Sequence, residues 1–126
     1  MKHVLIVEPD RSFADLLAGV LADVCSTRIE STAQSAVDWL DQPKRTCDMV
    51  ITELFLGDRS GVELVHELRS YSDWTRLPVV VHSRVDRPRS LTTDVLNNDY
   101  GIIDFIKKGP HSVDKIKDYV RAITTI

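Results

Sequence analysis

One stretch of the sequence decides the fold: Asp48–Leu64, which reads DMVITELFLGDRSGVEL. It opens with the apolar run Met49–Leu56, passes through a loop that contains two glycines, and leads into a segment with helical spacing at Val62, Val65 and Leu68. The apolar run is rich in Val, Ile and Leu and mostly does not alternate with polar residues, which is typical of a strand buried on both faces of a parallel sheet. A strand followed directly by a helix predicts an α/β protein.

The same change of period recurs along the chain. Other runs of strand length lie at Val4–Val7, Leu77–Val81 and Gly101–Ile106, and the weaker, alternating run Thr27–Glu30 suits an edge strand. Apolar stripes at helical spacing lie within 13–24 and 113–123, with shorter candidates at Ala36–Leu40 and Leu91–Leu96. The alternation predicts five βα units in one domain over residues 1–126, doubly wound around a five-stranded parallel sheet with helices on both faces.

Composition argues against several classes of protein. Lys plus Arg is 16 and Asp plus Glu is 19, so the net charge is −3, and no long basic run offers a surface for direct nucleic-acid binding. No apolar run approaches the roughly 20 residues that a membrane span requires. The N-terminus is too acidic for a secretory signal, and the two cysteines form no C-x-x-C motif. We therefore expect a cytoplasmic protein without a membrane contact.

Enzyme motifs are also missing from the sequence. It has no G-x-x-x-x-G-K-[ST] phosphate loop and no G-x-S-x-G nucleophile elbow. A flavin site would need a phosphate-binding loop after the first strand, where Glu8 and Asp10 would repel phosphate. The four histidines show no metal-ligand spacing, and a structural or solvated role is expected for each. We expect no enzymatic activity.

Polar residues follow the predicted strands where each strand ends. Glu8 and Asp10 follow the first strand, Glu53 the third, Ser83 the fourth and Lys108 the fifth. Because parallel strands bring their carboxyl ends to one edge of the sheet, these groups should share a crevice. Carboxylates facing a lysine and a serine suit a phosphoryl or Mg²⁺ site.

Together these features resemble the response-regulator receiver domain of two-component signalling, over essentially the whole chain. The resemblance rests on VLIVEPD at 4–10, the stretch at 48–64, LPVVVHS at 77–83, the spacing Phe105-x-x-Lys108 and the closing amphipathic helix. It implies a flavodoxin-like sheet of strand order 2-1-3-4-5. It also implies that the domain exchanges a phosphoryl group with a histidine kinase and signals by contact with a partner protein.

The resemblance assigns roles residue by residue. Glu8 matches the first metal-binding acid, and Asp10 is counted with it in an acidic pocket, although a helix starting there would point Asp10 elsewhere. Ser83 matches the hydroxyl that binds the phosphoryl group and Lys108 the lysine that pairs with it, while Phe105 matches the switch aromatic.

Two positions depart from the family pattern in ways that affect the chemistry. The phosphoacceptor aspartate is replaced by Glu53, and the second metal-binding acid by Pro9. With few carboxylates, Mg²⁺ binding should be weak or absent, its remaining ligands being Glu8, Glu53 and the Phe55 carbonyl. The longer Glu53 side chain should reach Lys108 and Ser83 directly, and an ångström of misplacement can cost about 10²-fold in a transfer reaction.

We therefore expect a pseudo-receiver in which a Glu53–Lys108 pair fixes one conformation without phosphate. The alternative is a conventional receiver that still accepts a phosphoryl group at low efficiency. The resemblance places the partner surface on the fourth helix, fifth strand and fifth helix, roughly Leu91–Ile126. A histidine kinase remains a candidate partner, and a homodimer is left open.

Smaller features have competing interpretations. Gly57, Gly109 and Arg84 also differ from common family residues, and the segment from Ser83 to Lys108 is slightly longer than usual. Asp58 is a poor alternative phosphoacceptor, because a lone acid on an exposed loop usually supports the turn. The basic cluster of Arg84, Arg87 and Arg89 is either simply solvated or available to a partner or to Glu53.

Overall fold

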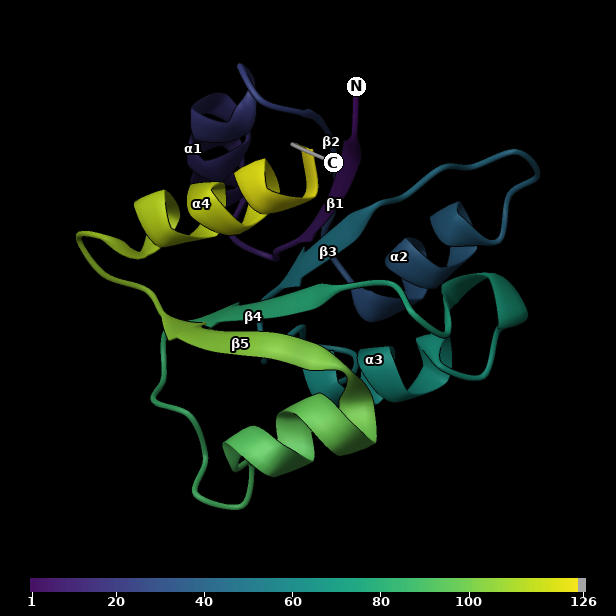
Figure 1. The fold of residues 1–126 in the computed structure, drawn as a ribbon, viewed down its shortest axis with the longest axis vertical. Helices are drawn as coiled ribbons and strands as arrows, with labels where there is room; N and C mark the ends of the chain where they lie inside the picture. The colour runs from purple at the N-terminus through teal and green to yellow at the C-terminus, as the bar shows by residue number, and fades with distance from the viewer. Residues whose placement is uncertain (125–126) are drawn as a thin grey trace.

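A five-stranded parallel sheet runs through the centre of the protein (Figure 1). The computed structural model describes residues 1–124; the last two residues of the predicted partner surface, 125 and 126, lie outside the described residues. The strand order is β2-β1-β3-β4-β5, and every pairing is parallel. The strands are β1 (His3–Val7), β2 (Ser26–Glu30), β3 (Met49–Thr52), β4 (Val79–Ser83) and β5 (Ile102–Lys107). The predicted fold class is confirmed, including β2 at an edge.

Helices cover both faces of the sheet, as predicted (Figure 1). One layer holds α1 (Arg11–Leu21) and α4 (Ser112–Thr124). The other holds α2 (Ala33–Leu40), α3 (Gly61–Leu68), the short 3₁₀ helix η1 (Ser72–Trp74) and the π-helical η2 (Val95–Tyr100). Alternate strand residues enter the two layers, which explains why the three central strands β1, β3 and β4 are mainly apolar. None of the helices within residues 1–124 is long and apolar enough to cross a membrane.

The fourth helix differs from its prediction. It was expected over Leu91–Leu96, whereas η2 spans Val95–Tyr100. The Thr92 hydroxyl accepts a hydrogen bond from the Val95 N–H at 3.2 Å, and Gly101 ends the segment with a φ of 67°. Leu91 packs against the core from the loop that precedes η2. The apolar pattern therefore starts in this loop, which is why it places the start of the helix too early.

A β-bulge in β5 changes which side chains face each layer. Val79 pairs with Ile102 but the next residue, Val80, pairs with Asp104, so Ile103 is the extra residue. Ile102 consequently packs in the α2–α3 layer, whereas Ile106 packs in the α1–α4 layer. The bulge accommodates one residue of the long segment between Ser83 and Lys108, and it leaves the Ile103 side chain 41% exposed.

Candidate functional site

Three charged residues meet at the carboxyl ends of the strands. Glu8 directly follows β1, and Glu53 directly follows β3 with its N–H donating to the Val7 carbonyl at 2.9 Å. Lys108 directly follows β5, where its N–H donates to the Ser83 carbonyl at 2.7 Å. These two backbone hydrogen bonds continue the strand pairing by one residue. They therefore fix the backbone positions from which the Glu53 and Lys108 side chains extend.

The Lys108 ammonium joins both carboxylates. Its Nζ hydrogen-bonds Glu8 Oε1 and lies 2.8 Å from Glu53 Oε2. All three side chains are nearly inaccessible, with exposed fractions of 9% for Lys108, 7% for Glu8 and 4% for Glu53. The predicted Glu53–Lys108 contact is therefore present, and a Glu8–Lys108 contact that was not predicted accompanies it. Two carboxylates share one ammonium, so the cluster carries one net negative charge.

Glu53 is held in its ionised form. Its Oε1 accepts a hydrogen bond from the Leu54 N–H at 2.7 Å. Burial alone raises the pKa of Glu53, but hydrogen bonding to Lys108, Ser83 and the Leu54 backbone, together with the Lys108 charge, brings that pKa below its ordinary value. The carboxylate thus stays charged at neutral pH and keeps its attraction for Lys108.

An aromatic layer lies beneath the ammonium. Lys108 Nζ sits 4.4 Å from the centre of the Phe13 ring, a cation–π contact, and Phe13 in turn packs on His82 with ring centres 5.1 Å apart. His82 Nε2 is 2.8 Å from the Ser112 hydroxyl at the start of α4. Burial and the Lys108 charge lower the pKa of His82 to about 4, so the ring is neutral at neutral pH. Residue spacing in the sequence does not predict this connection between α1, β4 and α4.

Asp10 does not join the acidic pocket, which corrects its inclusion there. Its carboxylate accepts a hydrogen bond from the Phe13 N–H at 3.2 Å and caps α1, and the side chain is exposed. Capping is the better use of this carboxylate because the first N–H groups of a helix have no partner within the helix. Only its backbone contacts the site, through an N–H that donates to Glu8 Oε2 at 3.2 Å.

The donor set of the crevice does not fit a Mg²⁺ ion. Mg²⁺ requires near-octahedral oxygen ligands, whereas both carboxylates here are bound to the Lys108 ammonium and Pro9 supplies no carboxylate. Within residues 1–124, no three His, Cys, Asp or Glu residues lie together as a metal site would need. The Phe55 side chain is 58% exposed on the loop after β3.

The two predicted switch residues lie on neighbouring strands. Phe105 is half-buried against the α2–α3 layer. Ser83 is fully buried, two residues beyond Val81, which packs in that same layer. The Ser83 hydroxyl accepts a long hydrogen bond of 3.4 Å from the Val85 N–H. Both residues therefore line the same side of the sheet, on adjacent strands next to the charged cluster.

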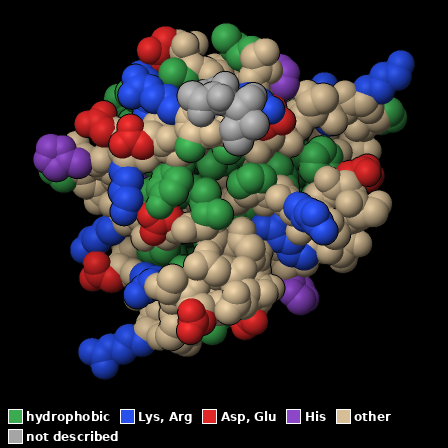
Figure 2. All heavy atoms as spheres, viewed as in Figure 1, with side chains coloured by type: hydrophobic (Ala, Val, Ile, Leu, Met, Phe, Trp, Pro, Cys, Tyr) green, Lys and Arg blue, Asp and Glu red, His purple; other side chains and the backbone are tan. Residues whose placement is uncertain are grey.

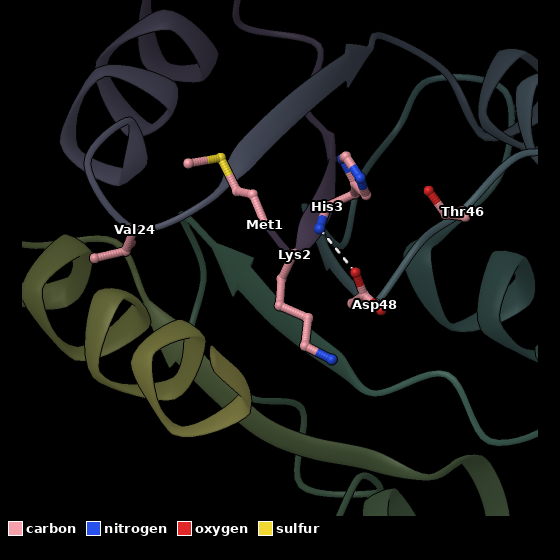
Figure 3. A pocket seen from close by; sticks show the side chains of 6 residues that line it. All are labelled: Met1, Lys2, His3, Val24, Thr46 and Asp48. Atoms are coloured by element: carbon pink, nitrogen blue, oxygen red, sulfur yellow. Dashed lines mark hydrogen bonds between the residues drawn. The ribbon is translucent and has the colours of Figure 1, made fainter. Parts of the chain in front are cut away.

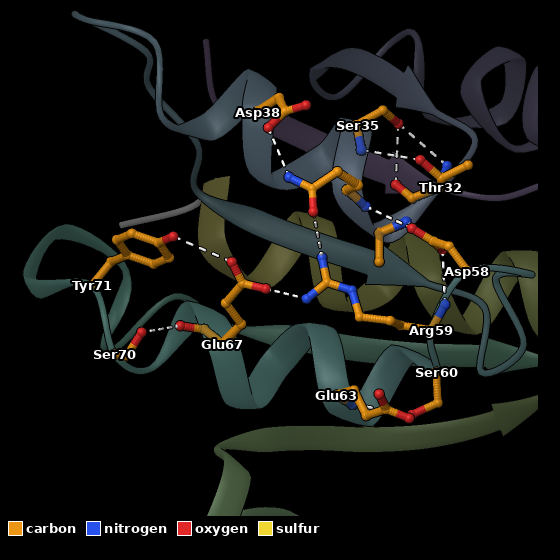
Figure 4. Close-up of polar contacts among 12 residues, drawn as sticks. Thr32, Ser35, Asp38, Asp58, Arg59, Ser60, Glu63, Glu67, Ser70 and Tyr71 are labelled. Carbon is orange, nitrogen blue, oxygen red and sulfur yellow. Dashed lines mark hydrogen bonds and ion pairs between the residues drawn. The ribbon is translucent and has the colours of Figure 1, made fainter.

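Asp58 is occupied by structural hydrogen bonds (Figure 4). Its carboxylate accepts from the N–H groups of Ala33 at 3.1 Å, Gln34 at 2.9 Å and Arg59 at 2.9 Å. It thus ties the loop after β3 to the N-terminus of α2, and Arg59 continues the network to Glu67 on α3. The expected supporting role for Asp58 agrees with these contacts.

The basic cluster near the crevice is exposed. Arg84, Arg87 and Arg89 are all solvent-accessible, and Arg87 donates to the Thr93 hydroxyl at 3.1 Å. The contacts that surround Glu53 come instead from Lys108, Ser83 and the Leu54 backbone.

Comparisons with known proteins agree with this architecture. Residues 4–121 match the response regulator receiver domain. The regulatory protein VirG of Agrobacterium tumefaciens is 30% identical over 121 residues, which is 96% of this chain but 43% of that protein, so the chain spans less than half the relative's length. A sensor protein from Polaromonas sp. JS666 superposes with a TM-score of 0.81 at 21% identity, over 98% of this chain and 96% of that one. The receiver domain of a signal transduction histidine kinase from Syntrophus aciditrophicus also gives 0.81, at 23% identity over 99% and 91%.

Proposed function

Because this chain belongs to the response regulator receiver domain family of two-component signalling, we propose that it is an atypical receiver that signals without being phosphorylated. The observation that carries the proposal is the buried Lys108 ammonium bound to both Glu8 and Glu53. In this arrangement the lysine that would pair with a phosphoryl group already has its anionic partners.

The charge and length of Glu53 favour a permanent pair over a transfer reaction. Its carboxylate is committed to the Leu54 N–H and to Lys108, so it is not free to attack a phosphorus atom in line. A carboxylate carries a single negative charge, compared with about −1.5 to −2 for a phosphoryl group. The pair therefore fixes one conformation of the site instead of alternating between two.

The same contacts support a receiver that works without a divalent cation and without enzymatic activity. Mg²⁺ would have to displace the Lys108 ammonium from two carboxylates, and the acid that would help it is replaced by Pro9. We expect Mg²⁺ to bind weakly or not at all.

Output is proposed to pass through η2, β5 and α4 to a protein partner in the cytoplasm, with a histidine kinase or a second copy of the chain as candidates. Figure 2 shows hydrophobic side chains gathered across the middle of this side of the molecule. The bulged residue Ile103 contributes an exposed apolar side chain on the edge strand. A contiguous exposed apolar patch is typical of an interaction surface.

The proposal is tested by intact-mass spectrometry after incubation with acetyl phosphate and Mg²⁺. The wild type is compared with the double variant Pro9→Asp/Glu53→Asp, and with Pro9→Asn/Glu53→Asn as a matched variant without the added acids. We expect the wild type and the Asn variant to remain unmodified and the Asp variant to gain one phosphoryl group.

Two outcomes contradict the proposal. A labile phosphoryl group on the wild type identifies a conventional receiver of low efficiency. An unmodified Asp variant shows that Pro9 and Glu53 are not what prevents the reaction.

A further inference from the structure

A second charged region lies at the opposite end of the sheet. His3 begins β1 and Ser26 begins β2, so this region is about 16 Å from Glu8, at roughly 3.3 Å per strand residue. A hollow of about 300 Å³ opens there, and Arg28, Lys44 and Arg45 line it. The hollow shares His3 with a wider one of about 610 Å³ (Figure 3). The hollow is therefore lined by positive charges, although the chain as a whole has a net charge of −3.

Trp39 organises the arginines of this groove. The guanidinium carbon of Arg45 lies 5.2 Å from the Trp39 ring centre, and that of Arg28 lies 5.8 Å from it. Stacking on an indole holds a guanidinium in place while its N–H edge remains available for a planar anion. Because the guanidinium groups already stack on the ring, the groove favours carboxylates over a stacked nucleic-acid base.

The cationic side chains are only partly neutralised. Arg28 pairs through Nε with Glu30 at 2.7 Å. The nearby Asp48 accepts the His3 N–H at 2.8 Å (Figure 3). Among residues 1–124 neither Lys44 nor Arg45 forms an ion pair, and Arg45 instead hydrogen-bonds the neutral side chain of Gln42. Two full positive charges thus remain available to a ligand.

We propose that this groove, formed by Arg28, Trp39, Lys44 and Arg45, binds an acidic peptide segment of a protein partner. Tryptophan and arginine are enriched among the few residues that carry most of the binding energy at protein interfaces. Arginine pairs with carboxylates through two parallel hydrogen bonds, which adds specificity to the attraction. The groove is separate from the Lys108 cluster, so the inference does not depend on whether the chain is phosphorylated.

The test measures fluorescence anisotropy of fluorescein-labelled hexaglutamate, with hexaglutamine as the neutral control peptide. The variant Arg28→Gln/Arg45→Gln is compared with Arg76→Gln/Arg89→Gln, which removes the same charge from exposed arginines outside the groove. Circular dichroism verifies that each variant is folded. We expect saturable binding to the wild type, a loss of about tenfold or more in the groove variant, and less than about twofold in the control variant.

Three results overturn the proposal. Equal weakening in both variants means that hexaglutamate responds only to overall charge. No saturable binding up to millimolar protein means that the groove does not take acidic peptides. Competition by a ten-nucleotide single-stranded DNA at lower concentration than unlabelled hexaglutamate assigns the groove to nucleic acid instead.

Discussion

Replacing Lys108 by Met keeps a side chain of similar length but removes the only cation that contacts Glu8 and Glu53 among the described residues. At an effective dielectric constant of about 20, unit charges 2.8 Å apart attract by about 6 kcal/mol, and the cost of desolvating the three groups offsets part of this. Removing one partner of a buried ion pair typically costs about 3–5 kcal/mol. We expect a loss of about 3 kcal/mol in the free energy of unfolding at pH 7.5, a large part of the 5–15 kcal/mol typical of a domain.

The loss should depend on pH in a definite direction. In the wild type the pKa of Glu53 is lowered, so its stabilisation is present above the ordinary carboxylate pKa and disappears as the pH falls through the lowered pKa. In Lys108→Met, burial and the neighbouring Glu8 carboxylate raise the pKa of Glu53, so Glu53 is protonated at a higher pH in the variant than in the wild type, and this protonation removes the unpaired buried charge. The difference between wild type and variant therefore shrinks between pH 7.5 and pH 5.

Urea unfolding followed by circular dichroism at both pH values measures this difference. Lys107→Met is the matched control, because Lys107 pairs at 3.1 Å with Asp86 and both side chains are largely exposed. It should change the free energy of unfolding by less than about 1 kcal/mol. The reasoning is refuted if the two variants unfold at the same urea concentration, or if the Lys108→Met loss is the same at both pH values.

Two further predictions concern the surroundings of the cluster. In Gly61→Ala the added Cβ would lie 2.5 Å from the Glu53 carbonyl oxygen, so we expect a loss of about 1–3 kcal/mol, whereas Gly19→Ala, in open space within α1, should stabilise by about 0.5–1 kcal/mol. Thermal unfolding of the two variants checks this, and similar melting temperatures would contradict it. In an NMR titration the His82 ring should stay neutral until the pH falls to about 4. In the unfolded chain the same ring binds a proton near pH 6.5, so the free energy of unfolding decreases as the pH falls from 6.5 to 4. A His82 titration midpoint near 6.5 would show that the ring is not buried as described.

The arrangement of the elements was predictable, but their ends were less so. Four apolar runs and one alternating run, separated by helical stripes, predict the parallel sheet with two covered faces, and the family resemblance supplies the strand order. The apolar run that begins with the third strand extends to Leu56, whereas β3 ends at Thr52, next to the expected end at Glu53. Leu54 and Leu56 are buried from the loop, with exposed fractions of 4% and 2%. An apolar run in the sequence therefore predicts which residues are buried, but it does not show where the strand ends, because loop residues can be buried too.

The site was predictable in composition but not in connectivity. Strand ends identify Glu8, Glu53 and Lys108 as neighbours, and the length of Glu53 predicts its pair with Lys108. The second ion pair, between Lys108 and Glu8, depends on side-chain rotamers. Residue spacing in the sequence does not specify those rotamers. The capping of α2 by Asp58 was equally hidden, because the N–H groups that it satisfies are 24 and 25 positions away in the sequence.

The ion pair between Glu8 and Lys108 also bears on the order in which the chain folds. These residues are 100 positions apart, so their contact closes a loop of most of the chain. It forms only once the first and last strands both occupy the sheet, after β3 and β4 have been placed between them. Interactions that form after the transition state chiefly slow unfolding and leave the folding rate nearly unchanged. We therefore expect the charged cluster to slow unfolding of the completed sheet more than it changes the rate of folding.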